Sequence, residues 1–389
     1  MAAPPPPSPS ALARRVNLIE ALTEQLDGQC AVSEDAPETM SEQEIREAFS
    51  AMMGVSAAPP PVLPPEPDAA AFRAWFPRAA QTAAAGSSSS SSSSPRPVVL
   101  AFPPAGCGED VYTHGGGGGK EGDGGNPLLE WCRAHGADLL AAQPPGRGAR
   151  LREPAPRDLR AYAEQVAPLV ARRIAQAPWW AVAGHSKGSW AAVECLRALG
   201  RLLPPSHHRR PLPLRLMVVG AMPPPDWPEN QRPWRRQRDL DDAAFRDECR
   251  GWDVSPQLLD GDDGAMWRLF EPALRADFRL FDEYEHVQEG QEEGEGRRQE
   301  GVRPRRVLAF WGARDRRVTE AMVEAWRAWA APSSFSVQRV DGHHLWPLEW
   351  RQGGGKGTGE DPRVAWLRAI AEALDEEEAS AGDGDGGRD

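Results

Sequence analysis

The sequence lacks several features that point to common functional classes. It has no basic excess, because 45 Lys and Arg against 57 Asp and Glu give a net charge of −12, and this argues against a nucleic-acid-binding protein. Much of the negative charge lies in two runs that start at Glu283 and Asp375 and are typical of solvated loops or tails. No apolar run approaches the roughly 20 residues that span a bilayer, and the N-terminus has no apolar signal-peptide core.

Cysteine pairs and metal motifs are also missing. The five cysteines are odd in number and form no CxxC pair, which favours a reducing compartment over a disulfide framework or a zinc site. HExxH is absent, and Glu121 follows the lysine of "GGGGGK" where a phosphate loop has Ser or Thr. We expect a cytoplasmic monomer with no metal, cofactor, nucleic-acid partner or membrane partner. Plastid targeting is a second interpretation of the N-terminus, which has two arginines and no acid before Glu20.

What is present is a globular composition with low-complexity interruptions. A length of 389 residues with 40% hydrophobic residues allows a large core. We expect a flexible, partly helical extension over 1–66, a globular domain over 67–372 and an acidic disordered tail over 373–389. The extension is either loosely docked or a partner-docking element. The stretches rich in Ser, Gly or Glu are expected to be insertions, at 86–95, 114–125 and 287–301.

Strands alternate with helices through most of the predicted domain. Short apolar runs such as "VVLAF", "WWAVAG" and "LRLMVVG" predict buried strands, and "DLRAYAEQVAPLVARRIA" has helical spacing. This alternation predicts an α/β fold with a mostly parallel central sheet flanked by helices. The interval 223–286 is mostly helical in pattern and interrupts the alternation.

The pentapeptide "GHSKG" at 184–188 lies between a predicted strand and a predicted helix. A nucleophile elbow requires this context, because the sharp turn raises the serine hydroxyl above the sheet and small neighbours let strand and helix approach. Ser186 is therefore the candidate nucleophile, against the alternative of an ordinary strand-to-helix turn. His185 is expected to point away from the serine and to be structural.

An elbow serine needs a base and an orienting carboxylate, which follow it in the order acid, then base. Asp315 lies just past a predicted strand in "LAFWGARD", and His343 lies after the next strand in "VDGHHLW". We predict Asp315 as the acid and His343 as the base. His344 is the rival base, Asp341 is a weaker rival acid, and a surface ion pair is the alternative for Asp315.

The oxyanion hole needs backbone N–H groups at the same sheet edge. In the loop "FPPAGCG" the two prolines have no N–H, so Ala105 is the first usable donor, with Gly106 next. Lys187, directly after the serine, is the predicted second donor. The alternative for this loop is an ordinary Pro-Gly turn.

Taken together, these stretches resemble the type II thioesterases of polyketide and nonribosomal peptide synthesis, and the related medium-chain acyl-carrier-protein hydrolases of fatty acid synthesis. The resemblance runs from about Phe72 to Trp346 and rests on five stretches in the family's order. They are "LAFPPAG", "QPPGRGARLREP", "GHSKG", "EPALRADFRLFDEY" and "WGARDRRV" with "VDGHHLW". Two positions depart from the pattern: Lys187 replaces Met or Leu, and 341–344 read Asp-Gly-His-His in place of Gly-Gly-His-Phe.

The resemblance implies an α/β-hydrolase fold with a helical lid over 223–286 and hydrolysis of acyl thioesters on carrier-protein phosphopantetheine through an acyl-serine. Aromatic side chains of the lid are then expected to line the acyl channel, at Trp227, Trp234, Trp252, Trp267 and Phe270. Lid arginines offer a docking patch for an acidic acyl or peptidyl carrier protein, with solvated surface charge as the alternative, at Arg232, Arg235, Arg236 and Arg238. The competing functions are an esterase for small oxygen esters and a non-enzymatic carrier-binding scaffold.

Overall fold

The computed structural model describes residues 63–79, 95–114, 125–203, 214–261, 264–286, 304–349 and 361–382. The chain divides into two units, 1–62 and 63–389, and every described residue belongs to the second. The helices predicted in the N-terminal extension and nearly all of the predicted insertions lie outside the described residues. None of the helices within the described ranges has the length and apolarity needed to cross a membrane.

Six strands form one sheet in the order β2-β1-β3-β4-β5-β6, and each neighbouring pair is parallel. The strands are β1 (Val98–Phe102), β2 (Asp138–Ala141), β3 (Trp180–His185), β4 (Leu214–Gly220), β5 (Arg306–Gly312) and β6 (Phe335–Val340). This arrangement confirms the predicted parallel α/β sheet. The chain runs outward from β1 to β2 and then returns to place β3 on the other side of β1, so the strand order reverses there.

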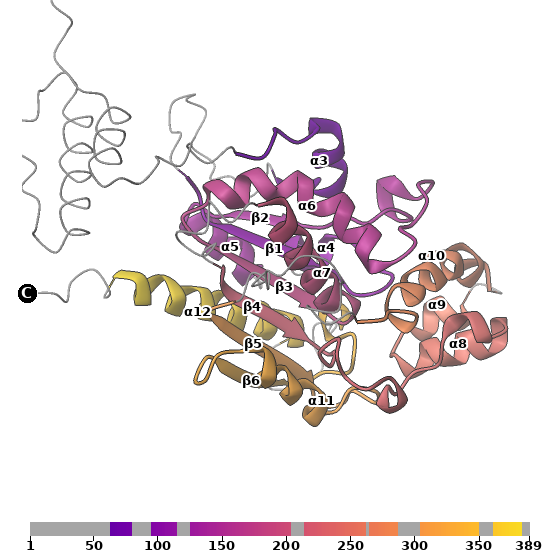
Figure 1. Ribbon diagram of the computed structural model, residues 1–389. Helices are drawn as coiled ribbons and strands as arrows, with labels where there is room; N and C mark the ends of the chain where they lie inside the picture. Colours follow the sequence, from indigo (N-terminus) through magenta and orange to yellow (C-terminus); the bar gives the residue numbers. More distant parts are fainter. Residues whose placement is uncertain are drawn as a thin grey trace, which may run out of the picture. The chain divides into compact units, whose positions relative to one another are not determined.

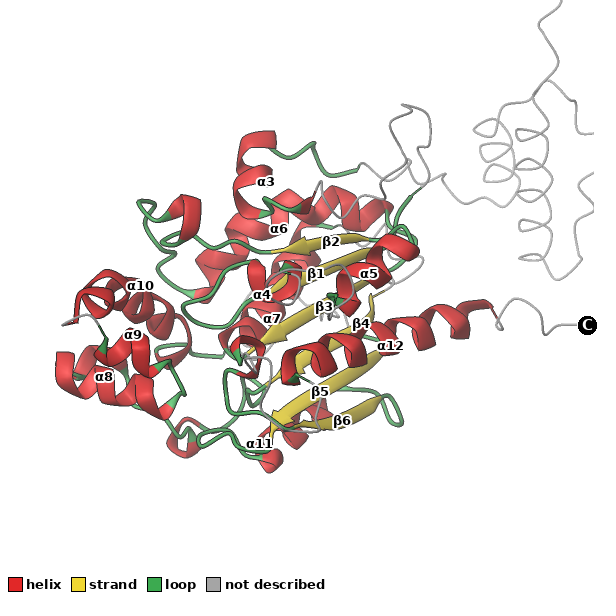
Figure 2. Cartoon of the chain, turned by 180° about the vertical axis from the view of Figure 1, so that it is seen from behind, coloured by secondary structure: helices red, strands yellow, loops and turns green. Residues whose placement is uncertain are grey.

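Both faces of the sheet are buried, as the continuous apolar strands require. In β1, Val98, Leu100 and Phe102 join one apolar cluster, whereas Val99 and Ala101 join the other. The first cluster is covered by α3 (Ala69–Trp75), α6 (Leu159–Gln176), α7 (Lys187–Leu202) and α11 (Glu320–Glu324). The second is covered by α4 (Asp110–Thr113), α5 (Pro127–Ala134) and α12 (Pro362–Gly382), seen from behind in Figure 2.

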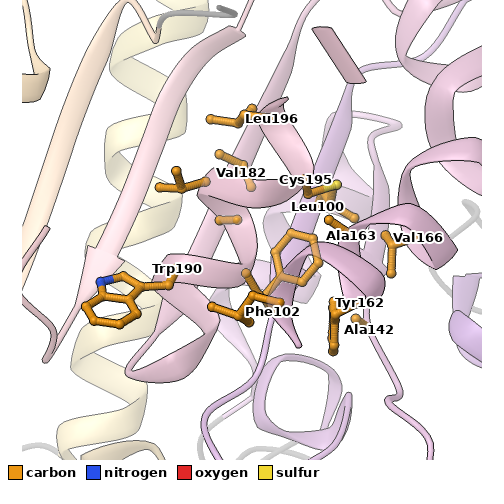
Figure 3. Packing of buried hydrophobic residues seen from close by; sticks show 14 of the residues in the cluster. Leu100, Phe102, Ala142, Tyr162, Ala163, Val166, Val182, Trp190, Cys195 and Leu196 are labelled. Carbon is orange, nitrogen blue, oxygen red and sulfur yellow. The ribbon is translucent and has the colours of Figure 1, made fainter. Parts of the chain in front are cut away.

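The first core layer packs aromatic and aliphatic side chains between the sheet and two long helices. Figure 3 shows Phe102 of β1 close to Tyr162 of α6, with Trp190 of α7 on the other side. The ring centroids of Phe102 and Tyr162 are 6.0 Å apart, and Trp190 is fully buried. This packing fixes α7, which starts directly after Ser186, against the sheet.

Between β4 and β5, the residues that the structure describes form three α-helices outside the sheet layers. They are α8 (Asp242–Gly251), α9 (Pro256–Asp260) and α10 (Ala265–Asp282), preceded by the 3-10 turns η4 (Glu229–Gln231) and η5 (Gln237–Asp239). Figures 1 and 2 show this group beyond the carboxyl ends of the strands. We call α8, α9 and α10 with their connecting segments, 223–286, the lid.

The C-terminal region corrects one predicted boundary. The sequence predicts a disordered tail from residue 373, but helix α12 continues to Gly382. Ala373 and Leu374 are buried in the second core layer. The acidic residues that follow therefore extend a helix whose apolar face is already anchored, and the prediction is wrong for 373–382.

Candidate active site

The topology brings two loops together at one edge of the sheet. In an open parallel sheet, ligands bind beyond the carboxyl ends of the strands at the point where the strand order reverses. Here that point lies between β1 and β3, which are paired from Val98 to Phe102. The loop after β1 contains Ala105, and the turn after β3 contains Ser186. Both predicted elements of a serine site therefore reach the same place.

Ser186 occupies a strained turn between β3 and α7. Its φ of 52° and ψ of −127° lie outside the regions that side chains favour, which is the conformation expected of a nucleophile elbow. The turn depends on both glycines of the pentapeptide. A Cβ at Gly184 would meet the carbonyl oxygen of Gly188 at 2.4 Å, and a Cβ at Gly188 would meet that of Phe102 at 2.1 Å.

Three side chains form a continuous hydrogen-bonded chain at this turn. The Ser186 hydroxyl donates to Nε2 of His344 over 2.9 Å, and Nδ1 of His344 donates to Oδ2 of Asp315 over 2.8 Å. We assign these directions because an ionised carboxylate can only accept. Ser186, His344 and Asp315 are thus arranged as a serine-hydrolase triad.

The predicted base, His343, is not part of this chain. Its backbone N–H and its Nε2 contact Oε1 of Glu349 at 2.5 and 3.1 Å, and its Nδ1 accepts from the N–H of Leu345. These contacts turn the His343 ring away from the serine. The structure therefore corrects the prediction, and the rival histidine, His344, takes the position beside Ser186.

The Asp315 carboxylate is buried and accepts hydrogen bonds. It does not form the surface ion pair that was the alternative. Its Oδ1 accepts from the backbone N–H groups of Arg317 and Val318, both at 2.9 Å. Burial raises the pKa of the Asp315 carboxyl, but the charge of His344 and these hydrogen bonds outweigh it and hold the pKa below its usual range. The rival acid, Asp341, is exposed and lies 3.6 Å from Arg314.

His185 also contributes to the site, indirectly. Its Nε2 lies 2.8 Å from the carbonyl oxygen of His344, and burial lowers the pKa of His185 to about 3. The neutral ring therefore donates to that carbonyl and fixes the backbone of the histidine beside the serine. The predicted structural role agrees with this geometry, although the sequence did not reveal the contact with His344.

One of the two candidate donors in the loop after β1 is engaged elsewhere. The N–H of Gly106 donates to Oδ2 of Asp277 over 2.7 Å and is therefore already used. Ala105 lines the same pocket as Ser186 and His344. Ala105 and Lys187, the first residue of α7, stay the predicted oxyanion donors.

An apolar pocket opens at the serine. Its lining combines Ala105, Ser186 and His344 with side chains of the lid and the loop after β6, namely Trp252, Val254, Leu274, Phe278, Phe281 and Leu345. Among the five lid aromatics predicted for this role, Trp252 alone lines the pocket, and its ring centroid lies 4.6 Å from that of His344.

The other four predicted lid aromatics pack elsewhere. Trp267 is buried against Phe245, and Trp234 contacts Trp190, Trp252 and Phe281. The indole N–H of Trp227 donates a hydrogen bond to the carbonyl oxygen of Gln231, and Phe270 is partly buried and packs against the core. The prediction is wrong at these positions because α10 presents Leu274, Phe278 and Phe281 to the serine instead.

Comparison with known proteins identifies the family of the chain. The family model of the thioesterase domain matches residues 131–353, which is more than half of the chain and includes Ser186, Asp315 and His344. The chain belongs to the thioesterase domain family. It is a thioester hydrolase of the serine-hydrolase type. No curated protein matches its sequence.

Solved structures share the fold of this thioesterase. RedJ, a thioesterase from the prodiginine biosynthetic pathway in Streptomyces coelicolor, is 23% identical with a TM-score of 0.51 over 88% of this chain and 99% of that chain. ClbQ from the colibactin NRPS/PKS pathway is 16% identical with a TM-score of 0.51 over 73% of this chain and 99% of that chain. At these identities the likeness shows a common α/β-hydrolase fold.

A buried ionic cluster links the lid of the thioesterase to the elbow. Asp277 of α10 accepts from Arg147 at 2.7 and 3.0 Å and lies 3.2 Å from Nζ of Lys187. Arg147 also donates to the carbonyl of Cys107 over 2.8 Å. Arg147 comes from the "PPGRG" stretch and Asp277 from "LRADF", so two stretches of the family resemblance meet at the unusual lysine.

The lid arginines predicted to form a docking patch are largely engaged within the lid. Arg235 donates to the buried carboxylate of Glu248 over 2.9 Å, and Arg236 pairs with Glu229. Arg232 donates to the carbonyl of Tyr284 and stacks on Trp190. Arg238 is paired more loosely than the other three arginines. Its guanidinium lies 3.9 Å from a carboxylate oxygen of Asp239 and 3.9 Å from one of Glu283.

One group of side chains in the described part of the chain has the donor set of a metal site. It comprises His135, Asp375 and Glu378. His135, which caps the C-terminus of α5, lies 3.4 Å from Asp375 and 3.6 Å from Glu378 of α12. Ordinary salt bridges account for this proximity, and none of these residues belongs to the serine site.

Proposed function

We propose that the chain hydrolyses acyl thioesters carried on the phosphopantetheine of an acyl or peptidyl carrier protein, in polyketide, nonribosomal peptide or fatty acid biosynthesis. The observation that carries the proposal is the chain Ser186–His344–Asp315 at the base of an apolar pocket. Family membership gives the thioester bond as the target. The carrier is suggested by the pathways named for RedJ and ClbQ.

The geometry supports a two-step mechanism. His344 accepts the Ser186 proton while Asp315 stabilises the imidazolium, and Oγ attacks the thioester carbonyl. The N–H groups of Ala105 and Lys187 bind the oxyanion that forms. The tetrahedral intermediate expels the pantetheine thiolate, which takes the proton from His344. Water, deprotonated by His344, then attacks the acyl-serine and releases the carboxylic acid.

The pocket suits an apolar acyl group. Leu274, Phe278 and Phe281 of α10 offer hydrocarbon and aromatic surface. An acyl chain bound there displaces water from apolar walls, which is favourable. Apart from Ser186, His344 and the Trp252 indole, the described lining residues have no polar side-chain atoms, and none is a carboxylate, Lys or Arg. This lining favours acyl groups without a free carboxylate.

Intact-mass analysis of a panel of acyl carrier proteins tests this function. The wild-type enzyme should remove the acyl mass and leave holo carrier protein, whereas Ser186→Ala should leave the acyl carrier intact. Removal by Ser186→Ala at the wild-type rate would overturn the mechanism. Absence of removal from every carrier, with hydrolysis of free acyl-pantetheine, would overturn the carrier assignment.

The alternative function is an esterase for small oxygen esters, since the same triad cleaves both bonds. Matched acyl-pantetheine thioesters and oxygen esters with the same acyl group separate the two. A higher kcat/KM for the oxygen ester would favour the esterase. A non-enzymatic scaffold is disfavoured because the described site contains an assembled triad.

A further inference from the structure

The cluster of Arg147, Lys187 and Asp277 holds two cations and one carboxylate out of water. Their residues are 7%, 0% and 1% exposed. Burial of an ammonium group costs free energy unless a partner stabilises it, and a well-packed apolar side chain is often the more stable choice. The lysine therefore calls for an explanation beyond packing.

The cluster is connected to both segments that carry the predicted oxyanion donors. Asp277 holds the N–H of Gly106, the residue after Ala105. Lys187 follows Ser186 and carries the other donor on its own backbone. An ionic group therefore binds the residue next to one predicted donor, Ala105, and another is the side chain of the second, Lys187.

The charges of the cluster do not balance. Burial raises the pKa of Asp277, but Arg147, Lys187 and their hydrogen bonds outweigh this and lower it to about 2, so the carboxylate is ionised. Arg147 pairs with it through two hydrogen bonds at 2.7 and 3.0 Å. Because Arg147 and Asp277 neutralise each other, a protonated Lys187 would add one surplus positive charge to the cluster.

Two further described neighbours of this amino group, Tyr162 and Cys107, are neutral. Its Nζ lies 5.5 Å from the ring centroid of Tyr162, a distance at which the ring face attracts a cation. Burial raises the pKa of Tyr162 and raises that of Cys107 to about 12, so both stay protonated. No second carboxylate in direct contact with Lys187 cancels its charge within the described residues.

We propose that the Lys187 side chain supplies a net positive charge behind the oxyanion hole and stabilises the tetrahedral oxyanion through its field. This inference rests on the proposed function only for the identity of the reacting carbonyl. In this proposal the Lys187 side chain does not touch the reacting atoms. Only the backbone N–H of Lys187 binds the oxyanion. A fixed charge in a buried site acts strongly because no solvent needs to reorganise around it.

The proposal has a pH signature. Burial lowers the pKa of Lys187, while Asp277 raises it in part, so the ammonium loses its proton at a lower pH than an exposed lysine. As pH rises through that pKa the surplus charge disappears. Turnover should then fall on the alkaline side, while Arg147 stays charged and Asp277 stays ionised.

The test compares Lys187→Met, which removes charge and hydrogen bond, with Lys187→Gln, which removes the charge and keeps a donor for Asp277. Both should lower kcat about tenfold with KM within about twofold, and both should lose the alkaline fall in kcat. The melting temperature of Lys187→Met should equal or exceed that of the wild type. Arg173→Met, a cation of α6 outside the cluster, is the matched control and should keep the wild-type kcat.

Two readouts separate this inference from the thioesterase assignment. One is kcat for an acyl-pantetheine thioester, and the other is the rate at which a fluorophosphonate labels Ser186, which needs no thioester. Wild-type kcat and labelling rate in Lys187→Gln would overturn the charge proposal, as would an alkaline fall that persists in this variant. If the wild type does not hydrolyse thioesters but both Lys187 variants are labelled more slowly than the wild type, the thioesterase assignment would be overturned and the charge proposal would stand.

Discussion

The sheet and the lid hold the same site by different physical means. On the sheet side, Ser186 is placed by a parallel ladder of buried apolar strands and by close backbone approach at Gly184 and Gly188. On the lid side, carboxylates reach across to the loops that carry the other site residues. The sheet therefore positions Ser186 through close packing, whereas the lid positions the neighbouring loops through contacts with its carboxylates.

Three carboxylates of the lid each engage a different loop of the site. All three side chains are at most 9% exposed. Their partners are Gly106 and Lys187 for Asp277, Arg317 beside the acid loop for Glu248, and the backbone N–H of His344 for Asp253. Because each lid carboxylate binds a different loop of the site, the site is complete only when the lid is packed in place.

This contrast implies different sensitivities in the two regions. A shape-based element fails when atoms are added, because interiors are close-packed. A charge-based element fails when its carboxylate is removed, because the cations and N–H groups that the carboxylate binds then stay buried and unpaired. Each region can therefore be tested by the change to which it is most sensitive, starting with the largest expected effect.

The largest effect should come from the histidine that closes the triad. His344→Ala removes the base beside Ser186 and should lower kcat about 10⁴-fold or more. His343→Ala removes a ring bound to Glu349 and should keep activity within about tenfold. Steady-state hydrolysis of an acyl-pantetheine thioester measures both. The reverse ranking would show that the hydrogen-bonded chain is not the reacting one.

The second effect tests shape on the sheet side. Gly188→Ala places a Cβ 2.1 Å from the carbonyl oxygen of Phe102, which is backbone and cannot move aside. It should destabilise the fold by about 3 kcal/mol or more. Denaturant unfolding measures the loss.

Gly200→Ala is the matched control in the same helix, since a Cβ added at Gly200 would meet nothing within 4 Å. Removing a helical glycine there should stabilise α7 by about 0.5–1 kcal/mol. A gain in stability at both glycines would mean that helix propensity, and not close approach to Phe102, decides the effect.

The third effect tests charge on the lid side. Glu248 is fully buried, accepts hydrogen bonds from Arg235 and Trp252 at 2.9 and 3.2 Å, and forms an ion pair with Arg317 at 3.1 Å. Glu248→Ala leaves these donors without their acceptor and should cost about 3 kcal/mol in denaturant unfolding. It should also lower kcat, because the Trp252 indole packs on His344.

An exposed pair gives the control for this change. Glu324 and Arg327 of the α11 region lie 2.7 Å apart, with side chains 35% and 63% exposed. Glu324→Ala should cost less than about 1 kcal/mol. Equal losses at Glu248 and Glu324 would contradict the view that the lid is held by buried charge.

Much of the sheet side could be predicted from the sequence, because it depends on local signals. Strand-turn-helix patterning around "GHSKG" and the order of Ser186 and Asp315 follow from short-range periodicity and chain order. The choice between His343 and His344 did not follow. It depends on Glu349, six positions after His343, and on His185 and Asp253, which bind His344 and are distant in the sequence.

The lid was harder to predict because its contacts are long-range. Helical spacing identified the interval 223–286, but not the face that each helix turns to the serine. Asp277 contacts Gly106, which is 171 positions earlier in the chain, and no local pattern encodes that separation. The partner of Lys187 could therefore be identified only from the fold.

The smallest effect tests whether the lid's charges also make the fold pH-dependent. Burial raises the pKa of Asp282, at the end of α10, to about 7. Its folded pKa lies above the unfolded value of about 4, so the ionised form disfavours the fold. The contribution of Asp282 to stability should be greatest below about pH 4 and should be lost as pH rises through about 7.

Asp282→Asn removes the ionisation and keeps an acceptor for the N–H of Gln237, which Asp282 binds over 2.6 Å. The variant should lose the fall in stability between about pH 4 and 7 and should gain about 2 kcal/mol at pH 8. Unfolding curves at several pH values measure this slope. Asp239→Asn, at an exposed position of η5, should keep the wild-type slope. If stability falls with pH in Asp282→Asn as it does in the wild type, Asp282 is already ionised in the folded protein over this pH range. Buried charge in the lid would then affect stability only through Asp277, Glu248 and Asp253.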